Sequence, residues 1–197
     1  LNLKPENNIT REIGAGIQLD GLLTGNDRLQ LKGGYFGTDA RNYIATRVDM
    51  KRMRSYSYNV SRARIWGWDM QGNYQSDYFD WMLSYNRTES MDASGREWLG
   101  SGNPDTLISD ISIPVGHGGV SAGWRAELSA AATHVKKGDP HQAGYTIHSF
   151  SLSYKPVSVK GFEASVTLDN AFNKLALNGK GVPLSGRTVS FYTRYQW

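Results

Sequence analysis

The chain has 197 residues, no cysteine, a net charge of +4 and a mean hydropathy of -0.50, and it is rich in tryptophan, tyrosine and glycine. The lack of cysteine excludes disulfide frameworks, thiol catalysis and thiolate metal sites. No segment approaches the roughly 20 apolar residues of a transmembrane helix. Lysine and arginine are spread along the chain without the clustered basic stripe of a nucleic-acid-binding protein, so we expect no nucleic-acid partner.

Alternation of apolar and polar residues with a period of two runs through the chain and predicts an all-β protein of about nine strands. The first four strands are expected at residues 9–23, 27–38, 55–74 and around 79–86. Each places its large apolar side chains on one face, among them Ile17, Leu31, Trp68 and Leu83.

The other five strands are expected at residues 117–126, 128–137, 145–156, 162–173 and 186–197. Small residues dominate the first two of these. The last strand, GRTVSFYTRYQW, alternates Val189, Phe191 and Tyr195 with polar residues and ends on Trp197. A chain end this apolar is what a strand with lipid on one side and water on the other requires.

The predicted connections alternate between short and long. Short ones are expected at residues 24–26, 75–77, 125–127 and 157–161, and long ones at 39–54, 92–116, 138–144 and 174–185. Outer-membrane barrels have short periplasmic turns and long extracellular loops, so this pattern predicts a transmembrane antiparallel β-barrel with every long connection outside. A soluble β-sandwich or jelly roll is the alternative, but aromatic residues near the strand ends match the girdles of a membrane barrel.

Nine is an odd number, whereas bacterial single-chain barrels close with an even number of strands, so we do not expect this chain to close alone. Leu3-Lys4-Pro5-Glu6, followed by Glu12-Ile13-Gly14, resembles the LKPE…E-x-G segment of TonB-dependent outer-membrane receptors. Further segments similar to motifs of that family are Asn59 through Gly67 to Asp69, Asn170-Ala171-Phe172-Asn173-Lys174 and Gly186-Arg187.

The resemblance implies a 22-stranded outer-membrane barrel that is filled by an N-terminal plug. Residues 1–197 resemble the C-terminal part of that barrel, about nine of its strands. The plug, the earlier strands and the segment that engages the TonB complex are then expected outside this chain, on a precursor with a signal peptide.

The ligand is suggested by a second resemblance. Leu1-Asn2-Leu3-Lys4 looks like the tail of the NPNL motif of haem and haemoglobin receptors, with Leu1 where that motif has proline, and the final part of the chain is most similar to haemophore receptors. This implies haem as a transported ligand, taken from a haem-carrying protein. The loop histidine that ligates haem in such receptors would lie upstream of Leu1. A ferric-siderophore receptor is the alternative, and a passive porin-like channel is a third reading.

Imidazole is a usual haem ligand, and all four histidines are expected toward the extracellular half of the barrel. His117 and His141 are weak candidates for haem contact, since an interfacial or loop histidine needs no ligand to explain it. Loop residues with large apolar side chains are candidates for contact with a partner, because an exposed aromatic ring buries a large area at little entropic cost. These candidates are Tyr43, Ile44, Trp98 and Leu99.

Basic residues gather near the outer end of the third predicted strand and are candidates for pairing with lipopolysaccharide phosphates. They are Lys51, Arg52, Arg54, Arg62 and Arg64. Four carboxylates, Asp69, Asp80, Glu163 and Asp169, are expected to face the barrel interior. No catalytic triad order, metal-ligand spacing or phosphate-binding glycine loop accompanies them, so we expect neither an enzyme nor a metal site.

Overall fold

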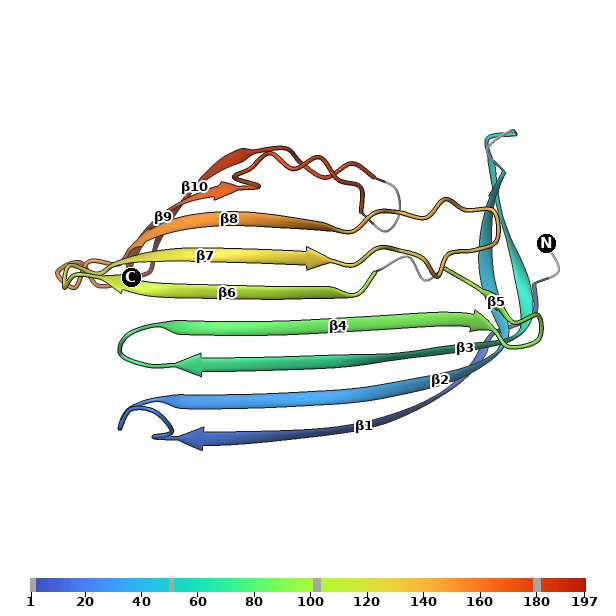
Figure 1. Cartoon of the computed structure of the whole chain (residues 1–197), viewed down its shortest axis with the longest axis horizontal. Helices are drawn as coiled ribbons and strands as arrows, with labels where there is room; N and C mark the ends of the chain where they lie inside the picture. The colour runs from blue at the N-terminus through green and yellow to red at the C-terminus, as the bar shows by residue number, and fades with distance from the viewer. Residues whose placement is uncertain (1–2, 50–51, 101–103, 179–181) are drawn as a thin grey trace.

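The computed structural model describes residues 3–49, 52–100, 104–178 and 182–197, and these form one antiparallel β-sheet (Figure 1). The described residues contain no helix that is long and apolar enough to cross a membrane. The strands are β1 (Asn7–Asp20), β2 (Arg28–Asp49), β3 (Arg54–Gln75), β4 (Asp80–Asp92), β5 (Glu97–Trp98), β6 (Thr106–Val115), β7 (Val120–Ser129), β8 (Tyr145–Tyr154), β9 (Phe162–Asp169) and β10 (Thr188–Tyr195).

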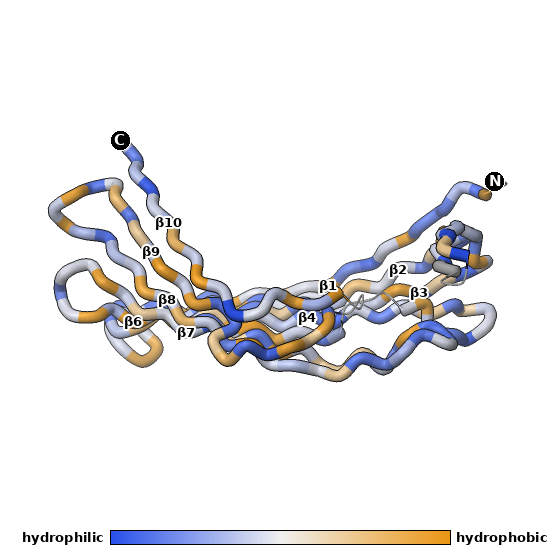
Figure 2. The backbone as a smooth tube through the Cα atoms, turned by 90° about the horizontal axis from the view of Figure 1, so that it is seen from above, coloured by the Kyte–Doolittle hydropathy of each residue, from blue (hydrophilic) through white to orange (hydrophobic). Residues whose placement is uncertain are grey.

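Neighbours in the sheet are neighbours in the sequence, in the order β1-β2-β3-β4-β6-β7-β8-β9-β10, and the two-residue β5 pairs with β4 alone. Figure 2 shows the sheet as a curved trough whose two edges, β1 and β10, rise on the same side. Among the described residues the two edges do not pair with each other. Unpaired backbone groups are costly in lipid, so a sheet of this curvature is stable there only as part of a closed barrel.

One face of the sheet is apolar from edge to edge. Residues that lie directly opposite each other in antiparallel strands point to the same face, and the registers pair Ile17 with Leu31, Trp124 with Phe150, and Val166 with Phe191. The other face carries Gln18, Lys32 and Gln71, together with the four carboxylates that were predicted to face inward. The predicted division into an apolar and a polar face is therefore confirmed.

Two strand predictions are wrong: one predicted strand is absent and one strand was missed, so nine strands remain besides the two-residue β5. The predicted long loop 92–116 contains β6, whose alternation is interrupted by Ser109 and ends near Pro114. The predicted strand 128–137 is instead mostly connection, held by a single bridge between Ala132 and Gln142. Its run of small residues lacks a repeating apolar face. The short turn predicted at 125–127 lies inside β7, and the true turn is residues 116–119.

The predicted alternation of connection lengths holds from β3 onward, whereas the predicted long connection between β2 and β3 is short because these strands extend into it. Residues 21–27, 76–79, 116–119 and 155–161 connect strands at one end of the sheet, which we call the short-turn end. The described parts of the connections 93–105, 130–144 and 170–187, together with the distal part of the β2–β3 hairpin, lie at the opposite, long-loop end (Figure 1).

The predicted loop 39–54 is mostly strand, because β2 and β3 continue as a paired hairpin far beyond the other strands. Asn42, with a φ of 53°, interrupts the ladder between the Arg41–Arg62 and Tyr43–Val60 pairs. Asparagine tolerates this left-handed conformation better than most residues. Figure 1 shows the distal part of the hairpin turning across the long-loop end instead of continuing along the sheet.

Candidate functional site

The short-turn end is held by a buried carboxylate. Asp27 is 1% exposed and accepts hydrogen bonds from the backbone N–H groups of Leu22, Leu23 and Thr24 and from the Tyr74 hydroxyl, at 2.6 to 2.9 Å. Burial alone would raise the pKa of Asp27, but these hydrogen bonds outweigh it and hold the pKa below its ordinary value. The Asp27 carboxylate therefore stabilises the turn and has a structural role.

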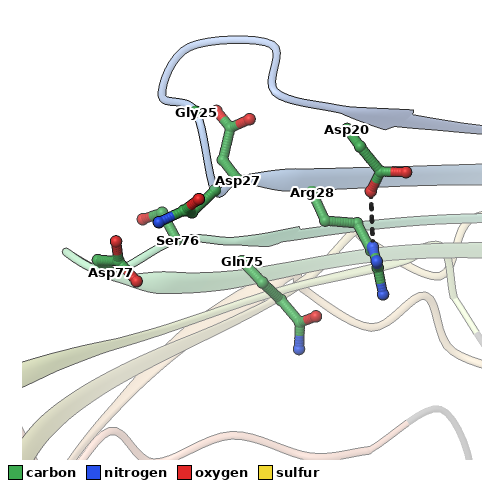
Figure 3. Close-up of a pocket in the computed structure, with 8 residues that line it drawn as sticks. Asp20, Gly25, Asp27, Arg28, Gln75, Ser76 and Asp77 are labelled. Atoms are coloured by element: carbon green, nitrogen blue, oxygen red, sulfur yellow. Dashed lines mark hydrogen bonds and ion pairs between the residues drawn. The ribbon is translucent and has the colours of Figure 1, made fainter.

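An open polar pocket lies beside this turn (Figure 3), on the polar face of the sheet. It has a volume of about 420 Å³, and the Arg28 guanidinium spans part of it to reach Asp20, with 2.7 Å between Nε and Oδ1. Its charged side chains Arg28 and Asp20 are paired with each other, and Asp27 is bonded within the turn. The long-loop end of the sheet is therefore the better candidate for the functional surface.

At the long-loop end, the segment before β1 is clamped to the β2–β3 hairpin. The Asn59 side chain accepts a hydrogen bond from the Lys4 backbone N–H at 2.7 Å and donates to the carbonyls of Lys4 and Asn42 at 3.0 and 2.6 Å. The Glu6 carboxylate accepts a hydrogen bond from the Ile44 N–H at 2.8 Å. Two of the segments that carried the family resemblance, LKPE and the strand beginning at Asn59, therefore contact each other directly. Leu1 and Asn2 lie outside the described residues.

Tyr43 and Ile44, two predicted partner contacts, lie at this clamp. Ile44 is 38% exposed. Tyr43 is half-buried against a small hydrophobic cluster, and burial, followed by the nearby Glu6 carboxylate, raises the pKa of its hydroxyl. The cluster consists of Ala40, Ala45, Val60, Ala63 and Leu99.

Trp98 and Leu99, the other two predicted partner contacts, are engaged within the protein. Leu99 is only 7% exposed, and its N–H donates to the Ser90 carbonyl at 3.0 Å. The Trp98 ring stacks on His134, with ring centroids 4.0 Å apart and an interplanar angle of 7°. Here the 93–105 and 130–144 connections pack against each other, so Leu99 offers little surface to a partner.

A polar network connects these loops to the strands. His134 Nδ1 lies 2.8 Å from Glu89 Oε1, and that same oxygen lies 3.0 Å from the Arg87 guanidinium. Arg87 also pairs with Asp105 at 3.5 Å. Lys136, two residues from the histidine, donates to the Thr46 carbonyl at 2.7 Å. This network was not predicted from the sequence, because its members lie far apart in the chain and carry no motif.

The histidines are divided between the two ends of the sheet. His117 lies in the short turn between β6 and β7, so its predicted place in the extracellular half is wrong; the unrecognised strand β6 reverses the direction of the chain there. His141 is exposed in the 130–144 connection at the long-loop end. His148 lies on the apolar face, where its Nδ1 accepts a hydrogen bond from the Trp124 indole at 3.2 Å.

Two asparagines of the NAFNK segment organise the connection before β10. Asn170, with a φ of 46°, donates from its side chain to the Lys174 and Ser185 carbonyls. Asn173 accepts a hydrogen bond from the Arg187 N–H at 3.0 Å, which joins this segment to the Gly186-Arg187 pair. These motif residues fix the backbone of the loop. Among the described residues, no group of three or more metal-ligating side chains is arranged to hold a metal ion.

Residues 1–173 match the family described as TonB dependent receptor-like, beta-barrel. The sequence is 42% identical to a hemin receptor of Yersinia pestis over 197 residues, covering 100% of this chain and 29% of that protein. It is 26% identical to TonB-dependent heme receptor A of Haemophilus influenzae over 226 residues, covering 97% of this chain and 30% of the relative. The chain thus spans about three tenths of the length of these curated relatives.

Solved structures support the same architecture. The copper transporter OprC superposes with a TM-score of 0.80 at 20% identity, covering 98% of this chain and 32% of that one. The FrpB iron transporter from Neisseria meningitidis superposes with a TM-score of 0.74 at 14% identity, with the same coverage. At such identities the likeness concerns the fold alone. Together with the sequence match, it shows that the chain belongs to the TonB-dependent receptor β-barrel family of the outer membrane.

Proposed function

We propose that this chain is the C-terminal part of the barrel of a TonB-dependent receptor that imports haem, received from a haem-carrying protein such as a haemophore. Haem is the transported ligand and not a prosthetic group. The observation that supports this most strongly is the 42% identity to the Yersinia pestis hemin receptor along the full length of the chain.

The proposal also gives a role to the rest of the receptor and to each face of the sheet. About nine of 22 strands are supplied here, and the remaining strands, the plug and the segment that engages the TonB complex are supplied by sequence outside this chain. The polar face, with Asp69, Glu163 and the Arg125–Asp110 pair, faces the plug and the transport path. The apolar face meets lipid, including lipopolysaccharide in the outer leaflet. The chain has a transport role and no catalytic one.

In this proposal, the long-loop end binds the haem-carrying protein and receives haem from it. Ile44 and Tyr43, on the distal hairpin, remain the best-placed predicted contacts for a carrier protein, and Trp98 supports them from within the loops. His141 is exposed at this end, as is His134, whose ring already stacks on Trp98 and contacts Glu89. His117, in the opposite turn, has no place in the proposed haem path.

The proposal is tested by experiments on the whole receptor that contains these residues. Titration of the purified receptor with haem should shift the Soret band, and a strain that depends on this receptor should grow on haem as its iron source only when TonB is present. Growth on a ferric siderophore without any Soret change would favour the siderophore alternative. Uptake that is independent of TonB would favour a passive channel.

A matched pair of histidine variants tests which end of the sheet binds haem. We expect His141→Ala to weaken haem binding about tenfold, because a ligand or hydrogen bond to a charged group is lost, whereas His117→Ala should bind as the unmodified receptor does. The Soret titration measures both. A loss confined to His117→Ala would show that the long-loop end is not where haem is bound.

A further inference from the structure

An unusual group of arginines lies on the apolar face at the long-loop end. The register places Arg11, Arg41, Arg62 and Arg64 on the same face as Ile13, Tyr35 and Trp68. We call these four residues the arginine cluster. The side chains of Arg11, Arg62 and Arg64 are 75%, 59% and 66% exposed. On this face the described strands β6 to β10 carry no lysine or arginine, and the one arginine of β4, Arg87, is paired with Glu89 and Asp105.

The cluster has more positive than negative charge. Asp39 lies at its centre, and its carboxylate is 3.1 Å from Arg62, 3.6 Å from Arg11 and 3.8 Å from Arg64. One carboxylate among four guanidinium groups leaves donors available for another anion. The nearest acidic residue of β4 on this face, Glu89, is already engaged by Arg87 and His134.

The position of the cluster corresponds to the headgroup layer of the membrane. Arg11 lies two residues beyond Ile13, about 7 Å along the strand. The tilted Tyr35–Trp68 ring pair, with centroids 4.7 Å apart, lies at the level of Ile13. The interfacial layer on each side of a bilayer is roughly 5 to 7 Å thick, so the arginines follow the aromatic row where lipid headgroups begin.

We propose that the arginine cluster binds the phosphate groups of lipid A, the phosphorylated glycolipid of the outer leaflet. Guanidinium groups pair with phosphate oxygens in bidentate fashion and remain charged at any physiological pH. The acyl chains of the same lipid cover the apolar side chains below, which a free phosphate has no means to use. The site rests on the outer-membrane orientation given under the proposed function and is independent of haem.

The test compares two double variants that remove equal charge from opposite faces. Arg62→Gln with Arg64→Gln removes half of the cluster. Lys32→Gln with Arg194→Gln removes two charges from the polar face. Each whole receptor is purified from outer membranes in mild detergent, and the lipid A retained per receptor is measured by mass spectrometry. We expect about a tenfold loss in the first variant, since each lost charged hydrogen bond is worth several-fold, and no change in the second.

Three further experiments distinguish lipid A from free phosphate as the bound anion. An additional variant provides a test if the arginine variant misfolds. Purified receptor is reloaded with bisphosphorylated lipid A, with dephosphorylated lipid A, or with inorganic phosphate as competitor. Retention that depends on the phosphates and resists inorganic phosphate supports the proposal, whereas displacement by an equal concentration of inorganic phosphate would show a free-anion site. Asp39→Asn, which removes the competing carboxylate, should raise retention.

Equal retention by the receptor and its Arg62/Arg64 variant would overturn the site. If that variant does not insert, an unchanged or lowered retention in Asp39→Asn would overturn it equally. The Soret titration is run on every variant. Loss of lipid A with an intact Soret shift supports the lipid site without touching the haem proposal, and an absent Soret shift in all variants rejects haem without touching the lipid site.

Discussion

The two ends of the sheet are stabilised in different ways. At the short-turn end, Asp27 closes its own turn and bonds to Tyr74 on the adjacent hairpin. At the long-loop end, the contacts join segments that are not neighbours in the sheet, such as Lys4 with Asn59, Thr46 with Lys136, and Glu89 with His134. Contacts at the short-turn end join a turn only to its neighbour in the sheet, as Asp27 does with Tyr74, whereas those at the long-loop end cross several strands. A ligand bound to one loop at the long-loop end therefore acts on several.

The largest effect is expected from a side chain added at the short-turn end. Gly119 has a φ of 78°, and a Cβ there would collide with the Lys155 carbonyl oxygen. We expect Gly119→Ala to destabilise the barrel by about 3 kcal/mol, from the left-handed backbone and the collision together. The amount of folded receptor in the outer membrane, read from heat-modifiable migration on gels, should fall several-fold.

Gly118→Ala is the matched control for this variant, because an added Cβ at Gly118 meets nothing within 4 Å. If both variants assemble equally well, the turn is not closely packed against residue 155 and the contrast between the two ends weakens.

The second effect concerns the clamp at the long-loop end. Asn59→Ala removes three hydrogen bonds to Lys4 and Asn42 and should cost about 2 kcal/mol locally. Because this clamp joins distant segments, we expect residues 3–6 and the distal hairpin to become sensitive to protease added to intact cells. Asn26→Ala, in an exposed turn at the other end, should leave the pattern unchanged. Identical digestion of both variants would argue that the clamp is dispensable.

The third effect is a pH dependence at the short-turn end. The pKa of Asp27 lies below its ordinary value of 3.8, so the folded state favours the ionised form. Its contribution to stability is complete above that ordinary value and is lost as the pH falls through the lowered one. Asp27→Asn should therefore unfold more readily at neutral pH and show a flatter dependence between neutral and acidic pH, measured by thermal unfolding in detergent. A parallel pH profile would contradict this, and Asp77→Asn is the control.

The smallest effect is expected where the loops meet. His134→Ala removes the stacking on Trp98 and the contact with Glu89, which together should contribute about 1 kcal/mol. We expect faster amide hydrogen exchange in both the 93–105 and 130–144 connections, since each stabilises the other. Faster exchange in only one of them would mean that the long-loop end is less connected than the structure indicates. His117→Ala should affect neither.

The same contrast explains what was predictable from the sequence. The division into two faces was correct because alternation is a local property, and Ile13, Trp68 and Phe191 each reveal it within their own strand. The strand β6 was missed because Ser109 interrupts its apolar face and Pro114 lies near its end. The contacts of Lys136 with Thr46, and of Asp39 with three arginines, depend on register and loop packing, which no local pattern contains.

Asn42 marks the point at which the distal part of the β2–β3 hairpin begins. The seven residues from Tyr43 to Asp49 extend about 23 Å beyond it. A rotation of about 10° at this residue, with the strand as a rigid arm, therefore moves the tip of the hairpin by about 4 Å. Since the hairpin turns across the end of the trough (Figure 1), a small change at Asn42 would displace its distal part, and the hydrogen bonds of Asn59 with Asn42, of Glu6 with Ile44 and of Lys136 with Thr46 oppose that displacement.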